Sequence, residues 1–380
     1  MLCQVGSEVD VYTRLSVRLV GGSGCEVFDE NGKKYIDLYG GHAVAGLGYN
    51  HPALTAAISG QAAEMVFQSN AVNLTVREEA CAMLGELAPP GLHRVFLINS
   101  GAEAIENALR IAFGATGRSR VTALKGSFHG RTAAAAAITD WGGKPYGLPR
   151  EPFEVDWLAP EDFAGVDQAI SSDTACVVFE PVQGVAGAID LSPEFVHALS
   201  VRARQVGALV VADEVQTGNG RTGTYFACEG FGLVPDLLVT AKALGGGFPA
   251  AAVCMTETLA AGLGRGSIAS TFGGGPMACA AMLAVMKTVN APGFLEAVRT
   301  GSEKLREACF AAGVKQISGK GYLLGLHLGQ PAGPVRERLL ELGFITGDAK
   351  KPDAVRLLPP LILEDSHIEG FAKALKVVLG

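Results

Sequence analysis

The stretch ALVVADEVQTGNGR, residues 208–221, runs from small apolar side chains directly into two carboxylates, Asp213 and Glu214. A continuous apolar run of this kind is typical of a strand that is buried on both faces of a sheet. An ionised carboxylate is costly to bury unless a partner receives its charge. The stretch therefore predicts an inner strand whose last residues meet a specific partner.

Short apolar runs alternate with helical patterns around this strand. Strands are predicted at 93–99 (HRVFLIN), 119–125 (SRVTALK), 174–181 (TACVVFEP), 235–242 (PDLLVTAK) and 250–255 (AAAVCM), and helices at 101–116 and 193–207. Continuous apolar runs separated by helices indicate an α/β fold, with a mostly parallel sheet covered by helices on both faces. Ligands of such sheets gather at the carboxyl ends of the strands.

The pattern changes near Pro276, and the rest of the chain predicts a smaller α/β lobe. Its elements are helices at about 276–290 and 294–312, the run YLLGLHL, a helix at 333–342, the runs GFITG and AVRLLPP, and an amphipathic helix from Ser366. The stretch 25–39 predicts a hairpin with its turn at Glu30–Gly32, which is too short to be stable alone. We therefore divide the chain into an N-terminal segment at 1–50 that packs with the small domain, a large domain at 51–280 and a small C-terminal domain at 281–380.

Composition and charge disfavour several classes of protein. Of the 380 residues 48% are hydrophobic and 18% charged, which suits a large buried core rather than a disordered chain. The net charge of −7 and the scattered basic residues suggest neither a nucleic-acid groove nor a membrane surface as partner. The sequence has no secretory signal pattern and no apolar stretch long enough to span a bilayer. Its eight cysteines are scattered without a CxxC pair, so we expect a cytoplasmic protein with buried thiols and no metal site.

The segment NSGAEA (99–104) takes a predicted strand directly into a helix through Ser100 and Gly101. Backbone N–H groups at a helix start, beside a hydroxyl and without bulky side chains, form a cradle for phosphate. The same residues fit an ordinary capped helix, with Ser100 as the cap and Glu103 completing a capping box. The segment matches neither the GxGxxG nor the GxxxxGK[ST] pattern, which disfavours dinucleotide and P-loop sites.

The segment KGSFHGRT (125–132) places Phe128, His129 and Arg131 in one glycine-bounded loop after a strand. An aromatic ring at this point could stack on a flat cofactor, and the guanidinium could clamp a carboxylate. A surface loop with a solvated arginine and a structural histidine fits the pattern equally well.

The segment TAKALGGGF (240–248) places Lys242 just beyond a strand, among small residues and glycines. Partial burial lowers the pKa of a lysine and frees its amine as a nucleophile, as Schiff-base chemistry requires. The alternative is a lysine that extends its stem from the strand end into solvent.

These features gain weight together, because all of them fall at the carboxyl ends of strands in one predicted sheet. They are a phosphate cradle, a stacking aromatic, a buried carboxylate and a desolvated lysine. One cofactor needs all four, namely pyridoxal 5′-phosphate (PLP). The lysine holds PLP as an imine, and the carboxylate keeps the ring nitrogen protonated so that the ring draws electrons.

With these motifs the sequence resembles the class III aminotransferases of fold type I, the ω-aminotransferase group. The motifs NSGAEA, FHGRT, EPVQG, DEVQTGNGRTG, AKALGGGFP and STFGGGP occur in the family's order and span nearly the whole chain. The runs DLYGGHAV, FHGRT and VRLLPPL are most similar to acetylornithine and succinylornithine aminotransferases. The resemblance implies a homodimer with shared active sites.

The resemblance also implies which residues hold PLP. Lys242 would form the imine and later shuttle a proton, Asp213 would pair with the pyridinium nitrogen, and Gln216 would hydrogen-bond the phenolic oxygen. The ring would stack on Phe128. The phosphate would lie at Ser100, Gly101 and Ala102, completed by Thr271 of the neighbouring subunit.

For the substrate, the resemblance implies three further residues. Arg131 would bind the α-carboxylate of an acylated ornithine, Arg356 would bind that of 2-oxoglutarate or glutamate, and Ser270 would approach from the neighbouring subunit. The implied reaction moves the ω-amino group of an N-acylornithine, acetylornithine first, to 2-oxoglutarate in a ping-pong cycle of arginine biosynthesis. Another ω-aminotransferase is the alternative, acting on succinylornithine, ornithine, 4-aminobutyrate or a carrier-linked lysine. An aminomutase, a decarboxylase and a catalytically silent dimeric protein are further alternatives.

One position departs from the family's pattern. Many relatives read EPVQGE where this chain reads EPVQGV and ends the motif at Val185. The second glutamate of those relatives is thought to pair with the arginine that corresponds to Arg356 while the ω-amino substrate is bound. Val185 cannot form this pair, so Arg356 either stays available throughout or is masked by another group, such as His42 or Glu180.

Overall fold

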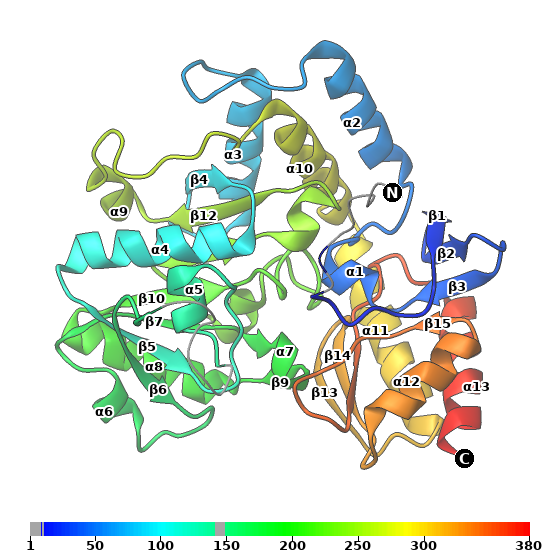
Figure 1. The fold of residues 1–380 in the computed structure, drawn as a ribbon. Helices are drawn as coiled ribbons and strands as arrows, with labels where there is room; N and C mark the ends of the chain where they lie inside the picture. The colour runs from blue at the N-terminus through cyan, green and yellow to red at the C-terminus, as the bar shows by residue number, and fades with distance from the viewer. Residues whose placement is uncertain (1–8, 10, 141–148) are drawn as a thin grey trace, which may run out of the picture.

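The computed structural model describes residue 9, residues 11–140 and residues 149–380, and Cys3 lies outside these ranges. Its main sheet has seven strands in the order β4-β12-β11-β10-β7-β5-β6 (Figure 1). The strands are β4 (Arg94–Ile98), β5 (Arg120–Leu124), β6 (Glu154–Leu158), β7 (Thr174–Phe179), β10 (Leu209–Asp213), β11 (Leu237–Thr240) and β12 (Ala251–Met255). β12 is antiparallel to both of its neighbours, and the other pairs are parallel. The predicted mostly parallel sheet is confirmed.

The strands of the main sheet are buried on both faces because alternate side chains enter two different cores. In β10, Val211 packs in the core that contains helix α4 (Gly101–Thr116). Its neighbour Val210 packs in the core that contains helix α8 (Pro193–Val206). Successive strand residues point to opposite faces, so an inner strand that is covered on both sides reads as an unbroken apolar run. Both predicted helices are confirmed.

Further helices pack against one another next to strand β4, at the edge of the main sheet. Helix α10 (Pro276–Val289) packs against α2 (Pro52–Glu64) and α3 (Thr75–Leu87) (Figure 1). Among the described residues, no single helix is long and apolar enough to cross a membrane. One pair, α10 with the sharply bent continuation α11 (Phe294–Ala311), passes by length and composition only when the two are taken together.

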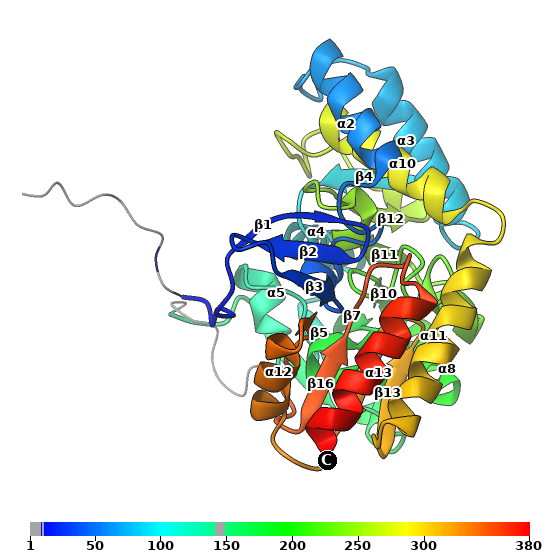
Figure 2. The ribbon, with the colours of Figure 1, turned by 90° about the vertical axis from the view of Figure 1, so that its right-hand side faces the viewer.

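The C-terminal part contains a three-stranded antiparallel sheet in the order β13-β14-β16. Its strands are β13 (Gln316–Lys320), β14 (Leu323–His327) and β16 (Ala354–Leu357). Helix α13 (Asp365–Leu379) contacts both α11 and α12 (Ala332–Glu341) beside this sheet (Figure 2). The predicted helices and strands of this part are present, and β13 is an addition that the sequence did not reveal.

The hairpin predicted at 25–39 is confirmed as β2 (Glu26–Asp29) and β3 (Lys34–Asp37). An unpredicted strand, β1 (Leu19–Ser23), pairs with β2. On the other side, β3 pairs in parallel with β15 (Phe344–Ile345), so the N-terminal strands are hydrogen-bonded to the C-terminal part of the chain. This pairing supplies the support that an isolated hairpin lacks.

Candidate active site

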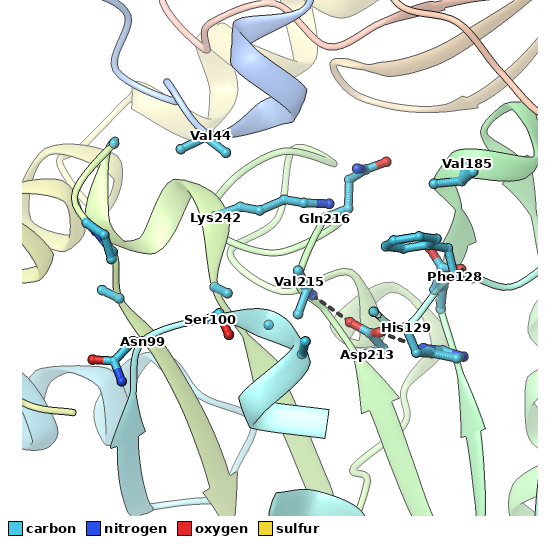
Figure 3. A pocket seen from close by; sticks show the side chains of 18 of the residues that line it. Val44, Asn99, Ser100, Phe128, His129, Val185, Asp213, Val215, Gln216 and Lys242 are labelled. Atoms are coloured by element: carbon cyan, nitrogen blue, oxygen red, sulfur yellow. Dashed lines mark hydrogen bonds and ion pairs between the residues drawn. The ribbon is translucent and has the colours of Figure 1, made fainter. Parts of the chain in front are cut away.

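A cavity of about 380 Å³ opens at the carboxyl ends of β10 and β11, beside the start of α4 (Figure 3). Many of the residues singled out from the sequence line it, namely Ser100, Gly101, Ala102, Phe128, Asp213, Gln216 and Lys242. The lining does not include Arg131, Ser270, Thr271 or Arg356. The fold therefore gathers the residues expected at the cofactor, whereas those expected at the substrate or in the neighbouring site lie outside this cavity.

Asp213, the last residue of β10, is only 3% exposed, and two donors meet its carboxylate. Oδ2 lies 2.7 Å from His129 Nδ1, and Oδ1 accepts a hydrogen bond of 3.0 Å from the Val215 N–H. His129 is buried as well, and its Nε2 has no partner among the described residues. Two hydrogen bonds of this kind hold a buried carboxylate in one orientation. His129 and the Val215 N–H are therefore the protein partners of the carboxylate at the end of the apolar strand, in addition to any ligand.

Lys242 follows β11 and extends across the cavity toward Gln216 (Figure 3). Burial lowers the pKa of the Lys242 amine to about 8, and the carboxylates of Asp213 and Glu180 oppose this shift. The expectation of a desolvated lysine is confirmed. A lysine with a pKa of about 8 carries an appreciable fraction of free amine near neutral pH, which makes it a competent nucleophile.

The start of α4 combines the cap and the cradle that the sequence left as alternatives. Ser100 caps the helix, with its Oγ accepting from the Glu103 N–H at 3.3 Å. The Glu103 carboxylate reaches back to the Asn99 N–H at 3.1 Å, one residue before the expected partner of a capping box. The N–H groups of Gly101 and Ala102 have no carbonyl four residues back within the helix, and both residues line the cavity. A helix start of this kind binds anions.

The sides of the cavity suit a flat ring with polar edges. Phe128 and Val215 both line it (Figure 3). The side-chain oxygen of Gln216 is buried without a partner among the described residues. A Cβ on Gly184 would lie 1.7 Å from that oxygen, so only glycine leaves room for Gln216 at this place. A buried polar atom without a partner is costly, which indicates that a ligand atom belongs beside it.

Two further buried acids differ in role. Glu214, which the sequence left without a function, has no exposed surface and accepts hydrogen bonds from the Thr217 hydroxyl and from the Cys228 N–H at 2.7 Å. It holds the loop after β10 and does not line the cavity. Glu180 does line the cavity, and burial raises the pKa of its carboxyl to about 7. Its oxygens accept from the Phe128 N–H at 2.9 Å and the Gly184 N–H at 3.2 Å.

The two arginines expected at the substrate differ in burial. Arg131 is exposed, and its guanidinium carbon lies 5.9 Å from the centre of the Phe128 ring. Arg356, on β16, is 5% exposed and donates a hydrogen bond of 2.8 Å to the Tyr39 hydroxyl. Val185 lines the cavity at the position where many relatives are expected to carry a glutamate.

Ser270 and Thr271 lie in the loop before α10, on the surface of the chain. Ser270 Oγ accepts from the Gly273 N–H at 2.9 Å and from the Asn99 side chain at 3.3 Å. Thr271 is exposed and Phe272 is 65% exposed. The loop therefore presents its tip outward, near the start of α4, and not into the cavity of its own chain.

Sequence reasoning did not foresee the His129–Asp213 pair or the place of Val215. Both partners of the pair lay in quoted motifs, but the contact joins residues 84 positions apart. Tyr39 was likewise quoted in DLYGGHAV without a role, and the structure places its hydroxyl on Arg356. One signal for the pair was present in the sequence. His129, a side chain that can donate a hydrogen bond, lies in the same loop as Phe128, the predicted stacking ring.

Comparison with known proteins agrees with this geometry. The model of the aminotransferase class-III family matches residues 10–379. The acetylornithine aminotransferase of Methanopyrus kandleri is 39% identical over 95% of this chain and 94% of its own. The [LysW]-aminoadipate semialdehyde transaminase of Deinococcus radiodurans is 36% identical over 97% of this chain and 87% of its own.

The chain belongs to the class III aminotransferases. A crystal structure of the ornithine aminotransferase of Toxoplasma gondii, with PLP at partial occupancy in its active site, superposes with a TM-score of 0.92 at 25% identity. The match covers 98% of this chain and 91% of that one. This protein is accordingly a PLP-dependent aminotransferase of fold type I, acting on ω-amino groups.

The residues present fit PLP. The cavity of this aminotransferase offers an anion cradle at α4, an aromatic side chain and a valine along its walls, and an unpartnered buried oxygen on Gln216. At one end lies a fixed carboxylate, Asp213, and at the other an amine of lowered pKa, Lys242. Groups of these kinds can hold a phosphate, the two faces and the phenolic oxygen of an aromatic ring, a ring nitrogen and an aldehyde carbon.

Proposed function

We propose that this aminotransferase moves the ω-amino group of an N-acylornithine, acetylornithine first, to 2-oxoglutarate, giving the semialdehyde and glutamate. The observation that carries the proposal is the pair of guanidinium groups near the Lys242 cavity. Arg131 lies beside Phe128, and the buried Arg356 lies on β16. A substrate with a carboxylate at one end and a reacting group at the other can be anchored by such groups. Relatives named acetylornithine aminotransferase at 35–39% identity support the choice.

The residues proposed to hold PLP are Lys242, Asp213, Gln216 and Phe128, together with the α4 start at Ser100, Gly101 and Ala102. When bound, PLP supplies an electron-withdrawing ring that stabilises negative charge on the substrate carbon. Asp213, which the His129 ring and the Val215 N–H hold in place, keeps a proton at the ring nitrogen. Lys242 provides the amine and then takes and returns a proton as its pKa of about 8 allows. Arg131 and Arg356 orient the carboxylates.

We also propose a homodimer in the cytoplasm, with Ser270 and Thr271 serving the neighbouring subunit's site. In support, both residues lie in a surface loop that does not line the cavity of their own chain. The loop carries an exposed phenylalanine, Phe272, whose ring lies 5.2 Å from that of Phe67. A place in arginine biosynthesis follows from the acetylornithine substrate.

A carrier-linked lysine derivative is the second candidate substrate. The relative from Deinococcus radiodurans named for the [LysW]-aminoadipate semialdehyde supports it, at an identity close to that of the acetylornithine enzymes.

A panel of half-reactions tests the proposal. The holoenzyme is mixed with acetylornithine, succinylornithine, ornithine, 4-aminobutyrate or lysine, and the loss of the visible absorbance of the bound cofactor is followed. We expect acetylornithine to react at least about tenfold faster than ornithine, as a pocket that matches one extra group discriminates. The Lys242→Ala variant should show no turnover and no borohydride-reducible band. Faster reaction with 4-aminobutyrate, or full activity in Lys242→Ala, would contradict the proposal.

A further inference from the structure

Arg356 carries a charge that is almost completely removed from water. Its Nε donates to the main-chain oxygen of Asp348, and its Nη2 donates to the Tyr39 hydroxyl at 2.8 Å. Both acceptors are neutral. Among the described residues, Asp348 supplies the one carboxylate within ion-pair distance, with Oδ1 3.8 Å from Nη2. A buried guanidinium needs a counter-charge, because an isolated ion is expensive to desolvate.

Asp348 reaches Arg356 from a segment that is hydrogen-bonded to position 185. Two residues after Asp348, the Lys350 N–H donates to the Val185 main-chain oxygen at 2.8 Å. One residue before it, Gly347 exchanges backbone hydrogen bonds of 2.9 and 3.0 Å with Arg356. The segment 347–350 therefore connects the arginine with the position at which a family glutamate is absent.

The place of this segment is fixed by Tyr39. A Cβ on Gly347 would lie 2.0 Å from the Tyr39 ring, so glycine is needed for the ring to pack there. The same ring lies 5.5 Å from the Arg356 guanidinium carbon. Tyr39 therefore packs against both the segment 347–350 and Arg356, and this packing places Asp348 beside the guanidinium.

His42 and Glu180, the other residues considered as partners of Arg356, do not neutralise its charge. Both oxygens of Glu180 accept backbone N–H groups of Phe128 and Gly184. Burial and the neighbouring Arg356 and Lys242 charges lower the pKa of His42, and its imidazole is neutral or positive, never negative, in the two protonation states concerned. Neither provides a negative charge to the guanidinium.

We propose that Asp348 is a specificity-determining residue of this aminotransferase, which neutralises Arg356 while the amino donor is bound and yields to the carboxylate of the oxo-acid acceptor. The side chain of Asp348 is 69% exposed and lies beyond hydrogen-bond distance, so water can receive it when a substrate carboxylate arrives. Asp348 acts through Arg356 and is a positioning residue. The inference rests on the proposed role of Arg356 in the reaction given above.

The test uses glutarate, an unreactive five-carbon dicarboxylate, as the probe of Arg356 in the holoenzyme. Calorimetric titration compares the wild type with Asp348→Asn, with the conservative Asp348→Glu and with Asp353→Asn. Asp353 is an acid five residues away that lies 3.9 Å from Lys351, and it serves as the matched control. We expect glutarate to bind roughly threefold to tenfold tighter to Asp348→Asn. In this variant the Asp348 carboxylate no longer competes with glutarate for Arg356, and the loss of one weak ion pair has an effect of this size. Asp348→Glu and Asp353→Asn should bind as the wild type does.

Kinetics provide a second readout. In Asp348→Asn the KM for 2-oxoglutarate should fall by a similar factor, and in Asp348→Glu it should stay as in the wild type, whereas a general loss of structure would raise the KM. Unchanged glutarate affinity and unchanged KM in Asp348→Asn would overturn the inference. Failure of the proposed function would look different, because the wild-type protein would then react faster with another donor than with acetylornithine, or with no donor, whereas the glutarate titration would still report on Asp348.

Discussion

At the scale of single residues, the charge of Lys242 contributes to the pH dependence of the stability of the cofactor-free protein. Burial lowers the pKa of this amine from 10.5 to about 8. Below about pH 8 the amine is protonated in both the folded and the unfolded chain, and the buried charge destabilises the fold. Between about pH 8 and 10.5 the folded chain releases this proton first, so the contribution of Lys242 to stability rises with pH. Above that interval both states are neutral and the penalty is gone.

Replacing Lys242 with methionine should therefore stabilise the cofactor-free protein near neutral pH. We expect a gain of about 2 kcal/mol at about pH 7, less than the full pKa shift implies because Lys242 keeps partial contact with solvent. The gain should shrink toward zero at about pH 10.5. Urea unfolding at both pH values measures it, with the exposed Lys125→Met as control, for which a change within about 0.5 kcal/mol is expected. A gain that is equal at both pH values would contradict a charge effect.

At the scale of elements, helix α4 carries the anion cradle only because it begins in close contact with the loop after β10. A Cβ on Gly101 would lie 2.9 Å from a Val215 methyl carbon, closer than side chains approach. Gly101→Ala should therefore displace the helix start from the loop that holds Asp213 and Gln216. We expect the dissociation constant of PLP to rise roughly tenfold or more, since a charge-assisted hydrogen bond contributes about 1.5–3 kcal/mol. Titration of the cofactor-free protein measures this change.

The same helix offers the control. Within the described part of the chain, a Cβ on Gly114 would meet no atom within 4 Å, so Gly114→Ala adds helix propensity without a clash. This variant should be more stable by about 0.5–1 kcal/mol and bind PLP as before. Equal PLP affinity in both variants would show that contact with Val215 does not position the cradle.

The helices and strands differ in how well the sequence predicts them. Inner strands such as β10 are covered on both faces and read as continuous apolar runs, and α4 was predicted at its observed bounds. Strand β6 lies at the edge of the sheet and is partly exposed, so it lacks the continuous apolar run that marks an inner strand. The His129–Asp213 pair depends on strand order, because β7 separates β5 from β10. Composition and periodicity do not determine that order, so motifs predicted the cofactor better than the contacts around it.

At the scale of the whole molecule, apolar side chains gather beside the loop that carries Thr271. Phe272 and Phe67 are in ring contact, and Val66 is exposed next to them. Contiguous exposed apolar groups of this kind are typical of protein interfaces. In a two-fold dimer such a loop would enter the partner's site as the partner's loop enters its own. The proposed shared active site therefore leads to a prediction about mixed subunits.

Two inactive subunits should restore activity to each other when they are combined. Lys242→Ala lacks the amine, and Thr271→Asp places a negative charge against the proposed phosphate of the partner's site. In a heterodimer purified through two different tags, one site combines an intact Lys242 with an intact Thr271, and the other carries both defects. We expect about half of the wild-type activity per heterodimer, because one of the two symmetric sites is whole. If Thr271 served the site of its own chain, every site of the heterodimer would be defective, and a folded, dimeric but inactive product would contradict the shared arrangement.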